Sequence, residues 1–327
     1  MVREFVQWRD KKGDKNMKKI LITLIDLVFI TSVAQASPLG AKITYKESRY
    51  EYFVVAVGGS QGSINNLGEI VYMTDAGMFS TTRGRLTKAS HDKRFPRIND
   101  SGEVVYCGAA ESSGAGPWTV YSTIRGKIAL GFSPSINNLG EIAYVDEQAY
   151  KPTINSTTRG TLVTINPGPA VYHSDINDSG EVVYKVNNQL FSTTRGLLAT
   201  IKEGGQGGAT INKSGDVLYS NERGIFYTDG TNLTTRLSNI SKIVRFGGPV
   251  DVNDYGDFVF GLWFSGKDKS FLMLATQRPK YYKRKYKSWN KFSGHNIPPA
   301  TVPLPFTKFL LDPGLTGLAW VRRNLQK

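Results

Sequence analysis

Cysteine is nearly absent from this sequence: Cys107 is the single one among 327 residues, so no intramolecular disulfide can form. We expect Cys107 to be a small buried residue on a strand, in a core large enough to need no crosslink. Histidine is also scarce, with three copies. His91 and His173 precede equivalent predicted strands, but not in neighbouring repeats, and two such ligands without a third do not indicate zinc.

The long middle of the chain lacks an excess of either charge. Residues 37–277 hold 23 Lys and Arg against 22 Asp and Glu, whereas residues 278–327 hold 11 against 1. A nucleic-acid-binding domain needs a basic face that neutralises phosphates, and this region offers none. The net charge of +14 therefore belongs to the two ends, and nucleic acid is excluded as a partner. Residues 37–277 also lack the sustained 3.6-residue periodicity of amphipathic helices.

What the middle region does contain is one phrase repeated six times at steps of 34, 38, 40, 35 and 41 residues. Its Asn and Asp side chains can cap their own backbone, and its Gly accepts a positive φ, so each copy predicts a tight turn followed by a strand. The copies read INNLGEIVY from Ile64, INDSGEVVY from Ile98, INNLGEIAY from Ile136, INDSGEVVY from Ile176, INKSGDVLY from Ile211 and VNDYGDFVF from Val252.

The unit that starts at Ile176 is expected to form four short antiparallel strands. Val- and Tyr-rich segments alternate with Asn-Asn, Arg-Gly and Gly-rich turns, which predicts strands over 181–186, 189–194, 197–201 and 209–211. Apolar residues stand on consecutive positions, as in Val182-Val183-Tyr184, so both faces of each small sheet need cover. Stacking such sheets around an axis supplies that cover and shelters their edges.

We therefore predict an all-β fold, a β-propeller of about six four-stranded blades over residues 37–277. The last repeat leaves the pattern at Arg278-Pro279, and the N-terminal strand near Tyr52 to Val57 could supply its missing outer strand and close the ring. An open β-solenoid or stacked array is the rival architecture.

The phrase Asn-x-x-Gly-Glu-x-x-Tyr resembles that of bacterial secreted tandem-repeat proteins, which are similar to HAF-type extracellular repeats. The resemblance covers about residues 50–277. It implies an exported repeat domain and no particular chemistry.

The N-terminal segment has the pattern of an export signal. Met17-Lys18-Lys19 is a short basic region, residues 20–33 are mostly apolar apart from Asp26, and Ala34-Gln35-Ala36 has the small residues of a cleavage site. We expect cleavage after Ala36, with residues 1–16 upstream of the true start. A lone membrane anchor is the alternative.

The C-terminal segment, residues 302–327, resembles a VPLP-type PEP-CTERM sorting signal. It has Val302-Pro303-Leu304-Pro305, an apolar stretch and the basic pair Arg322-Arg323. The resemblance implies an exosortase-like processing enzyme as a partner and membrane contact through the termini. The apolar stretch of 16 residues is shorter than a usual span and is interrupted by Asp312, so a terminal amphipathic helix is the alternative. Residues 278–301 are expected to be a basic linker with affinity for anionic surfaces.

Arginine recurs at one turn of the repeat and glutamate at the start of one strand. Facing strands place each Glu near the Arg of its own blade, which predicts structural pairs; a ring of arginines that binds anionic sugars or phosphates is the competing interpretation. The arginines are Arg83, Arg125, Arg159 and Arg195, with Arg278 as a candidate fifth, and their partners are Glu69, Glu103, Glu141 and Glu181.

The sequence displays no recognisable catalytic set, metal site or cofactor motif, and turn geometry alone accounts for the Asn and Gly of each phrase. We therefore expect an exported, non-catalytic binding or structural protein of the cell envelope or extracellular polysaccharide matrix of a Gram-negative-type bacterium, with anionic polysaccharide or surface proteins as partners. An extracellular propeller enzyme that cleaves a glycan or ester is the first alternative, and a periplasmic interaction scaffold is the second.

Overall fold

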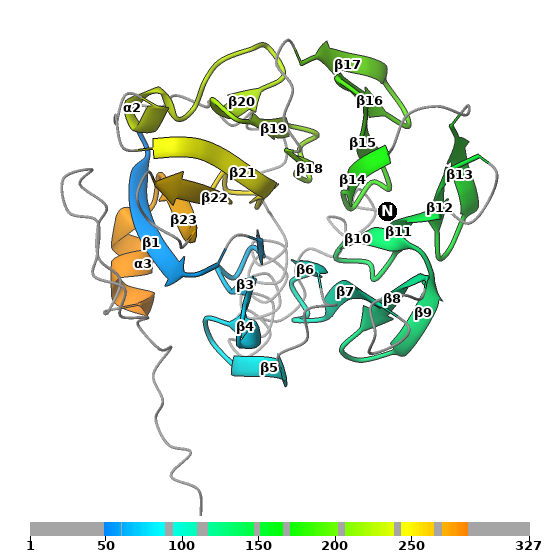
Figure 1. The fold of residues 1–327 in the computed structure, drawn as a ribbon, viewed down its shortest axis with the longest axis horizontal. Coiled ribbons are helices and arrows are strands. Elements are labelled where there is room, and N and C mark those ends of the chain that lie inside the picture. Colours follow the sequence, from blue (N-terminus) through cyan, green and yellow to red (C-terminus); the bar gives the residue numbers. More distant parts are fainter. Residues whose placement is uncertain are drawn as a thin grey trace, which may run out of the picture. The chain divides into compact units, whose positions relative to one another are not determined.

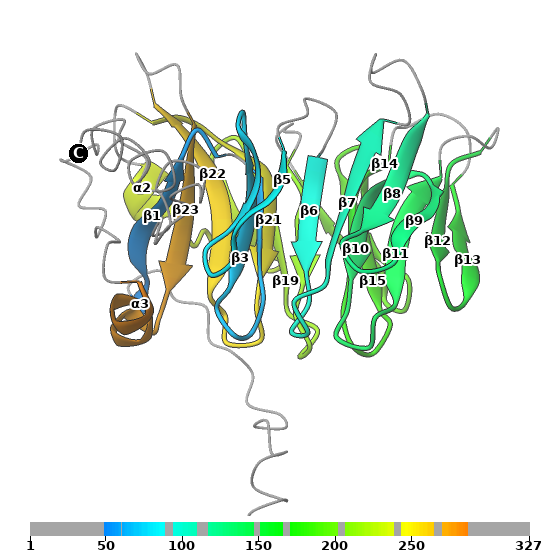
Figure 2. The same cartoon turned by 90° about the horizontal axis from the view of Figure 1, so that it is seen from below.

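Six small sheets stand around a common axis, so the protein is a six-bladed β-propeller (Figure 1). The computed structural model describes residues 49–59, 61–88, 94–109, 117–146, 151–165, 171–201, 207–238, 243–264 and 270–286. The strands of each blade run up and down beside one another, and their tight turns gather at the two ends of the propeller axis (Figure 2).

We number the blades one to six in chain order and give their strands from the axis outward. Blade one has β2 (Gly62–Ile64), β3 (Ile70–Thr74), β4 (Gly77–Ser80) and β5 (Gly84–Lys88). Blade two has β6 (Arg94–Ile98), β7 (Val104–Ala109), β8 (Trp118–Ser122) and β9 (Gly126–Leu130). Blade three has β10 (Phe132–Ile136), β11 (Ile142–Asp146), β12 (Thr153–Ser156) and β13 (Gly160–Thr164).

Blade four has β14 (Val171–Ile176), β15 (Val182–Val186), β16 (Gln189–Ser192) and β17 (Gly196–Thr200). Blade five has β18 (Ala209–Ile211), β19 (Val217–Asn221) and β20 (Gly224–Tyr227). Blade six has β21 (Ile243–Val252), β22 (Phe258–Phe264), β23 (Ser270–Thr276) and, as its outermost strand, β1 (Glu51–Val57). The described residues also form the helices α2 (Thr235–Ser238) and α3 (Pro279–Lys285).

The repeated phrase forms the turn between the first two strands of every blade. In blade one the Gly68 amide donates to the Asn65 carbonyl at 3.0 Å, and the Glu69 amide donates to Asn65 Oδ1 at 2.9 Å. Gly68 has a φ of +70°, a conformation that strains a residue with a side chain. The second position of the phrase therefore favours Asn for capping, and its fifth position favours Gly for backbone conformation.

Both faces of each blade are buried, as the apolar runs predicted. Val182 packs in a cluster with blade three, while the next residue, Val183, packs in a cluster with blade five. Consecutive strand residues point to opposite faces of a sheet, so one Val-Val pair serves two interfaces. The single cysteine, Cys107, is 1% exposed on β7, as expected, and burial raises the pKa of its thiol to about 12.

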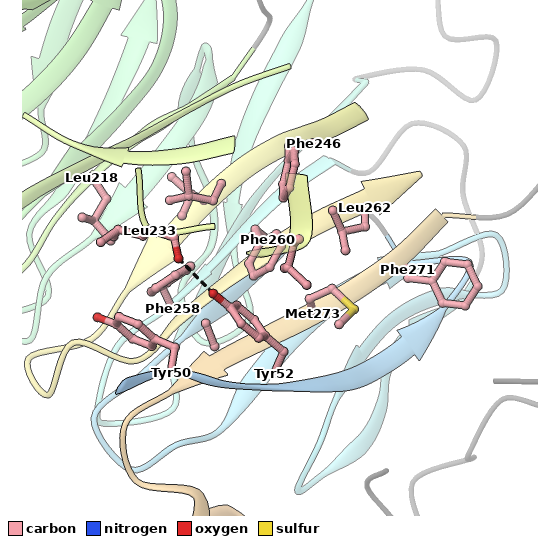
Figure 3. Packing of buried hydrophobic residues seen from close by; sticks show 14 of the residues in the cluster. Tyr50, Tyr52, Leu218, Leu233, Phe246, Phe258, Phe260, Leu262, Phe271 and Met273 are labelled. Atoms are coloured by element: carbon pink, nitrogen blue, oxygen red, sulfur yellow. Dashed lines mark hydrogen bonds between the residues drawn. The ribbon is translucent and has the colours of Figure 1, made fainter. Parts of the chain in front are cut away.

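The N-terminal strand closes the ring, which confirms the prediction made from its position. β1 pairs antiparallel with β23, and Glu51 lies opposite Thr276. Aromatic side chains fix β1 to the rest of the propeller. Tyr52 packs near Phe260, and the Tyr52 hydroxyl donates to the Leu233 carbonyl at 2.9 Å (Figure 3). Tyr50 similarly donates to the Gly256 carbonyl at 3.1 Å.

Blade five differs from the expected four strands, since the described part of it has three. Asn232 forms one isolated bridge with Phe226, and the chain then turns into α2. Leu233 and Leu237, four residues apart, are both buried in the cluster that joins blades five and six. The turn and α2 therefore bring both leucines against this cluster in place of an extended fourth strand.

Residues 278–286 also differ from the expectation of a linker, because α3 packs on the propeller (Figure 1). Tyr282 is fully buried, and its hydroxyl donates to Asp257 Oδ2 in blade six at 3.0 Å. Tyr286 donates to the Gly68 carbonyl in blade one at 2.8 Å. The basic and aromatic composition of this segment is thus used partly to cover the seam between the last blade and the first.

Several predictions from the sequence fall outside the described residues. They concern the cleavage residues Ala34 and Ala36, the motif Val302-Pro303-Leu304-Pro305, the pair Arg322-Arg323 and the remainder of the linker. Among the helices that are described, none has the length and apolar character needed to cross a membrane.

Candidate active site in the central channel

Six equivalent residues meet around the axis, each one position before the end of the innermost strand of its blade. Blades one, three and five supply hydroxyl groups, whereas blades two, four and six supply charged groups. All six are at most 6% exposed. In blade order they are Ser63, Arg97, Ser135, Asp175, Thr210 and Asp251.

A continuous set of hydrogen bonds joins four of these residues. Asp175 Oδ2 accepts from Thr210 Oγ1 at 2.7 Å and from the Ile211 amide at 2.9 Å. Thr210 Oγ1 also lies 3.1 Å from Asp251 Oδ1. Asp251 Oδ2 accepts from Ser63 Oγ at 2.6 Å and from a backbone amide at 2.8 Å. The two carboxyl groups are thus bridged by one hydroxyl, whose single proton cannot fully satisfy both.

Arg97 lies on the other side of the channel and is poorly paired. Its Nε is 4.0 Å from Asp175 Oδ1 and has no hydrogen-bond acceptor, while Nη1 reaches only the Pro96 carbonyl at 3.5 Å. The hydroxyl of Ser135 on the neighbouring strand is also buried without a partner. A buried donor without a hydrogen bond lowers the stability of the fold by about 1–3 kcal/mol, so we expect these donors to bind a ligand.

The environment of Asp175 raises the pKa of its carboxyl group to about 6. Burial is the main cause because it disfavours the charged form, and the negative charge of Asp251 acts in the same direction. Arg97 and the hydrogen bonds from Thr210 and Ile211 oppose the rise. A carboxyl group with this pKa can both take up and release a proton near neutral pH.

A second ring lies nearer the end of the channel where the Asn turns gather. Asn66, Asp100, Asn138, Asp178, Lys213 and Asp254 occupy equivalent positions in blades one to six. Neighbours are linked: the Asn66 amide donates to Asp100 Oδ1 at 2.8 Å, and the Asp254 amide donates to Asn66 Oδ1 at 2.8 Å. Burial, together with the charges of Asp178 and Asp100, raises the pKa of Asp254. Residues of both rings line a single pocket.

The first Asn of each phrase forms a collar that fixes the spacing of the blades. Asn65 Nδ2 donates to the Asn99 carbonyl at 3.1 Å, and Asn253 Nδ2 donates to the Asn65 carbonyl at 3.3 Å. The same bond links Asn99 to Asn137, Asn137 to Asn177 and Asn177 to Asn212. Because each collar residue also caps its own turn, the side chains of both rings are held on a rigid frame.

The repeated Arg and Glu residues do not line the pocket and are paired within each blade: each Arg stands at the turn between the two outer strands, and each Glu stands just before the second strand. Arg Nε lies 2.6–2.7 Å from the Glu carboxylate in Arg83–Glu69, Arg125–Glu103, Arg159–Glu141 and Arg195–Glu181. In blade six Arg278 pairs with Asp257. In blade five, where the turn has no Arg, the Tyr227 hydroxyl donates to Asp216 Oδ1 at 3.1 Å. A role of these arginines in binding anions stays a prediction.

Sequence reasoning missed the channel residues Arg97, Asp175 and Asp251. The signal was present, because these charged residues stand immediately before a repeated phrase where the other copies have Ser or Thr. Only the assembled ring shows that the six positions converge. Within the described ranges, no group of three or more His, Cys, Asp and Glu side chains is arranged to hold a metal ion.

No protein-family model matches the chain, and no curated protein matches it significantly. Solved structures with a similar fold include a gluconolactonase from Xanthomonas campestris, at 12% identity over 68% of this chain and 87% of that one, with a TM-score of 0.44. Virginiamycin B lyase from Staphylococcus aureus matches at 11% identity over 68% and 88%, with a TM-score of 0.42. A calcium-binding regucalcin from Agrobacterium tumefaciens matches at 11% identity over 67% and 93%, with a TM-score of 0.41.

The non-catalytic role expected from the sequence is corrected by the residues of the channel. The channel of this chain holds buried ionisable groups that break the repeat. Structural residues follow the repeat, as the Glu–Arg pairs do, whereas Arg97, Asp175 and Asp251 depart from it. Likeness at this level concerns the fold alone, so the chemistry has to be argued from the residues of the channel.

Proposed function

We propose that the protein is a hydrolase or lyase that acts on an ester or glycan in its central channel. The observation that carries this proposal is the unpaired Nε of Arg97, 4.0 Å from Asp175 Oδ1. A substrate bound here would have an oxygen beside a fixed positive donor and a proton-bearing atom, its own or that of a water, beside a proton-transfer group. Such a pairing of base and donor serves hydrolysis or elimination.

Asp175 is the general base in this proposal, through Oδ1. It takes a proton from water in hydrolysis, or from a carbon beside a carbonyl group in elimination. Arg97 donates a hydrogen bond to the oxygen on which negative charge develops, and its burial strengthens that interaction. Thr210 and Asp251 are positioning residues: the Thr210 hydroxyl holds the other oxygen of Asp175, and the charge of Asp251 helps to raise the pKa of Asp175.

A substrate screen with matched variants tests the proposal. The purified chain is assayed on aryl esters, on sugar lactones and on neutral and uronate-containing polysaccharides, beside Asp175→Asn and Arg97→Met. Asp75→Asn, which changes an exposed hairpin residue, is the control. We expect turnover that both channel variants lose and the control keeps. Absence of turnover on the whole panel, or equal turnover by all three variants, overturns the proposal.

We further propose that the enzyme is exported and sorted at the cell envelope by an exosortase-like enzyme. The basic and apolar pattern before Ala36 supports export, and Val302-Pro303-Leu304-Pro305 followed by Arg322-Arg323 supports sorting. Fractionation of a tagged chain with and without residues 302–327 tests this. Loss of envelope association on truncation is expected; identical distribution of the two forms overturns the sorting proposal.

A further inference from the structure

The pocket carries more negative than positive groups. Its ionisable lining residues are the carboxylic acids Asp100, Asp175, Asp178, Asp251 and Asp254 and the bases Arg97 and Lys213. A pocket whose lining has an excess of one sign of charge concentrates the resulting electrostatic potential on an incoming ligand. The excess of carboxyl groups therefore disfavours an anionic ligand in this channel.

The carboxyl groups of the outer ring are fixed in place. Asp100 accepts from the backbone and side-chain nitrogens of Asn66, both at 2.8 Å. Asp178 accepts from the same two groups of Asn138, at 2.8 and 3.2 Å. Asp254 accepts from the Lys213 amide at 2.7 Å and from Asn66 Nδ2 at 2.7 Å. Because these bonds link neighbouring blades, the carboxylates cannot swing away to admit another negative charge.

The inner ring offers a ligand both hydrogen-bond donors and a hydrogen-bond acceptor. Arg97 Nε and Ser135 Oγ are buried donors without partners, and Asp175 Oδ1 faces Arg97 as an acceptor. A carboxylate ligand could only accept hydrogen bonds, and its oxygens would confront Asp175. A hydroxyl group can accept from Arg97 and donate to Asp175 at once.

From these two features we infer that the channel binds a neutral, hydroxyl-rich ligand such as a sugar unit and discriminates against its anionic counterpart. The inference rests on the proposed function, because it names the substrate class of the same site. The substrate is then a neutral sugar ester, lactone or glycan rather than a polyuronate.

Two probes that differ only in charge test the inference on the full chain: methyl α-D-glucopyranoside and methyl α-D-glucopyranosiduronate. Binding is followed through the side-chain Nε–H signals of Arg97 and Arg125 in NMR spectra. We expect the neutral glycoside to shift the Arg97 signal and to bind about tenfold more tightly than the glucuronide. The Arg125 signal, whose Nε is already bonded to Glu103 at 2.7 Å, should stay in place.

Substitution of carboxyl groups in the outer ring tests whether their negative charge causes the preference for the neutral glycoside. The double change Asp100→Asn and Asp178→Asn is suited to this, because Asn66 and Asn138 already occupy equivalent positions. We expect the variant to bring the affinities of the two probes within about threefold, while Asp75→Asn leaves the gap unchanged. Added salt should also narrow the gap in the native protein.

Two outcomes overturn the inference: equal or tighter binding of the glucuronide, and no shift of the Arg97 signal with either probe. Binding of the neutral probe at Arg97 by a protein without turnover would support this inference and overturn the proposed enzymatic role. The two claims can therefore fail separately.

Discussion

Arg97 Nε and Asp175 Oδ1 lie 4.0 Å apart, on blades two and four, with the strand that carries Ser135 between them. The separation is too long for a hydrogen bond and suits one bridging oxygen atom. Both residues are at most 5% exposed and both break the repeat. An ion pair built only for stability would be expected to close to contact, as the Glu–Arg pairs of the outer turns do.

Replacement of Asp175 by Asn should remove catalysis without unfolding the protein. Asn keeps the shape and can still accept from Thr210, but it cannot take up a proton. We expect kcat to fall at least about 100-fold. In the native enzyme the base works only when ionised, so the rate should rise with pH through about 6. A residual rate in the variant with the same rise would show that another group is the base.

Asp175 should also make stability depend on pH in a recognisable direction. Its folded pKa of about 6 exceeds the roughly 3.9 of an unfolded Asp, so between these values the native state binds more protons. Its contribution to the free energy of unfolding is therefore fully present below pH ~4 and lost as pH rises through 6, by roughly 2–3 kcal/mol. Denaturant unfolding of the native protein and Asp175→Asn at pH 4, 5, 6 and 7 measures this: the difference between them should change over that window, and a constant difference contradicts the assignment.

Helix α3 should stabilise the closed ring. Tyr282→Phe keeps the aromatic side chain buried but removes the hydroxyl that donates to Asp257. The Asp257 carboxylate then remains buried with one hydrogen bond fewer. We expect a loss of about 1–2 kcal/mol in the free energy of unfolding. Tyr281→Phe, in the same helix, removes a bond from an exposed hydroxyl to the Leu67 carbonyl and should cost less than about 0.5 kcal/mol. Equal effects of the two changes would refute the special role of Tyr282.

The serine beside each Glu–Arg pair should contribute more to the free energy of unfolding than the arginine does. In blade four Ser192 Oγ donates to Glu181 and accepts from the Thr194 and Arg195 amides at 3.1 and 3.2 Å. Ser192→Ala removes a donor from the buried Glu181 carboxylate and an acceptor from both amides, and should cost about 1–3 kcal/mol. The Arg195 side chain is 42% exposed, so Arg195→Met should cost less than about 1 kcal/mol. Chemical unfolding that ranks the two variants in the opposite order would contradict this account.

Much of the fold could be predicted because the turns and strands of each repeat are specified by residues within that repeat. Asn177 and Gly180 specify a turn locally, and Val182-Val183 requires cover on both faces, so blade number and closure followed from spacing alone. Blade five and α3 were not predicted, because their shape depends on distant partners. Leu233 and Leu237 pack in a cluster shared with blade six, and Tyr282 is buried in a cluster shared with blades one and six and donates to Asp257.

The candidate site was harder to predict for a related physical reason. Arg97, Asp175 and Asp251 are far apart in sequence, and each alone resembles a solvated residue before a turn. Their burial and the raised pKa of Asp175 arise only when inner strands from different blades meet at one axis. Comparing the residue before each phrase across all six copies would have picked them out.

The pairing of β1 with β23 sets an order of events for a newly made chain. Glu51 emerges early from the ribosome, yet its partner Thr276 is made only after every blade has been synthesised. Until then the first strand, rich in Val and Phe, has an unpaired edge that must be kept from aggregating. Closure of the ring is therefore a late step in the folding of a newly made chain, because β1 must wait for β23.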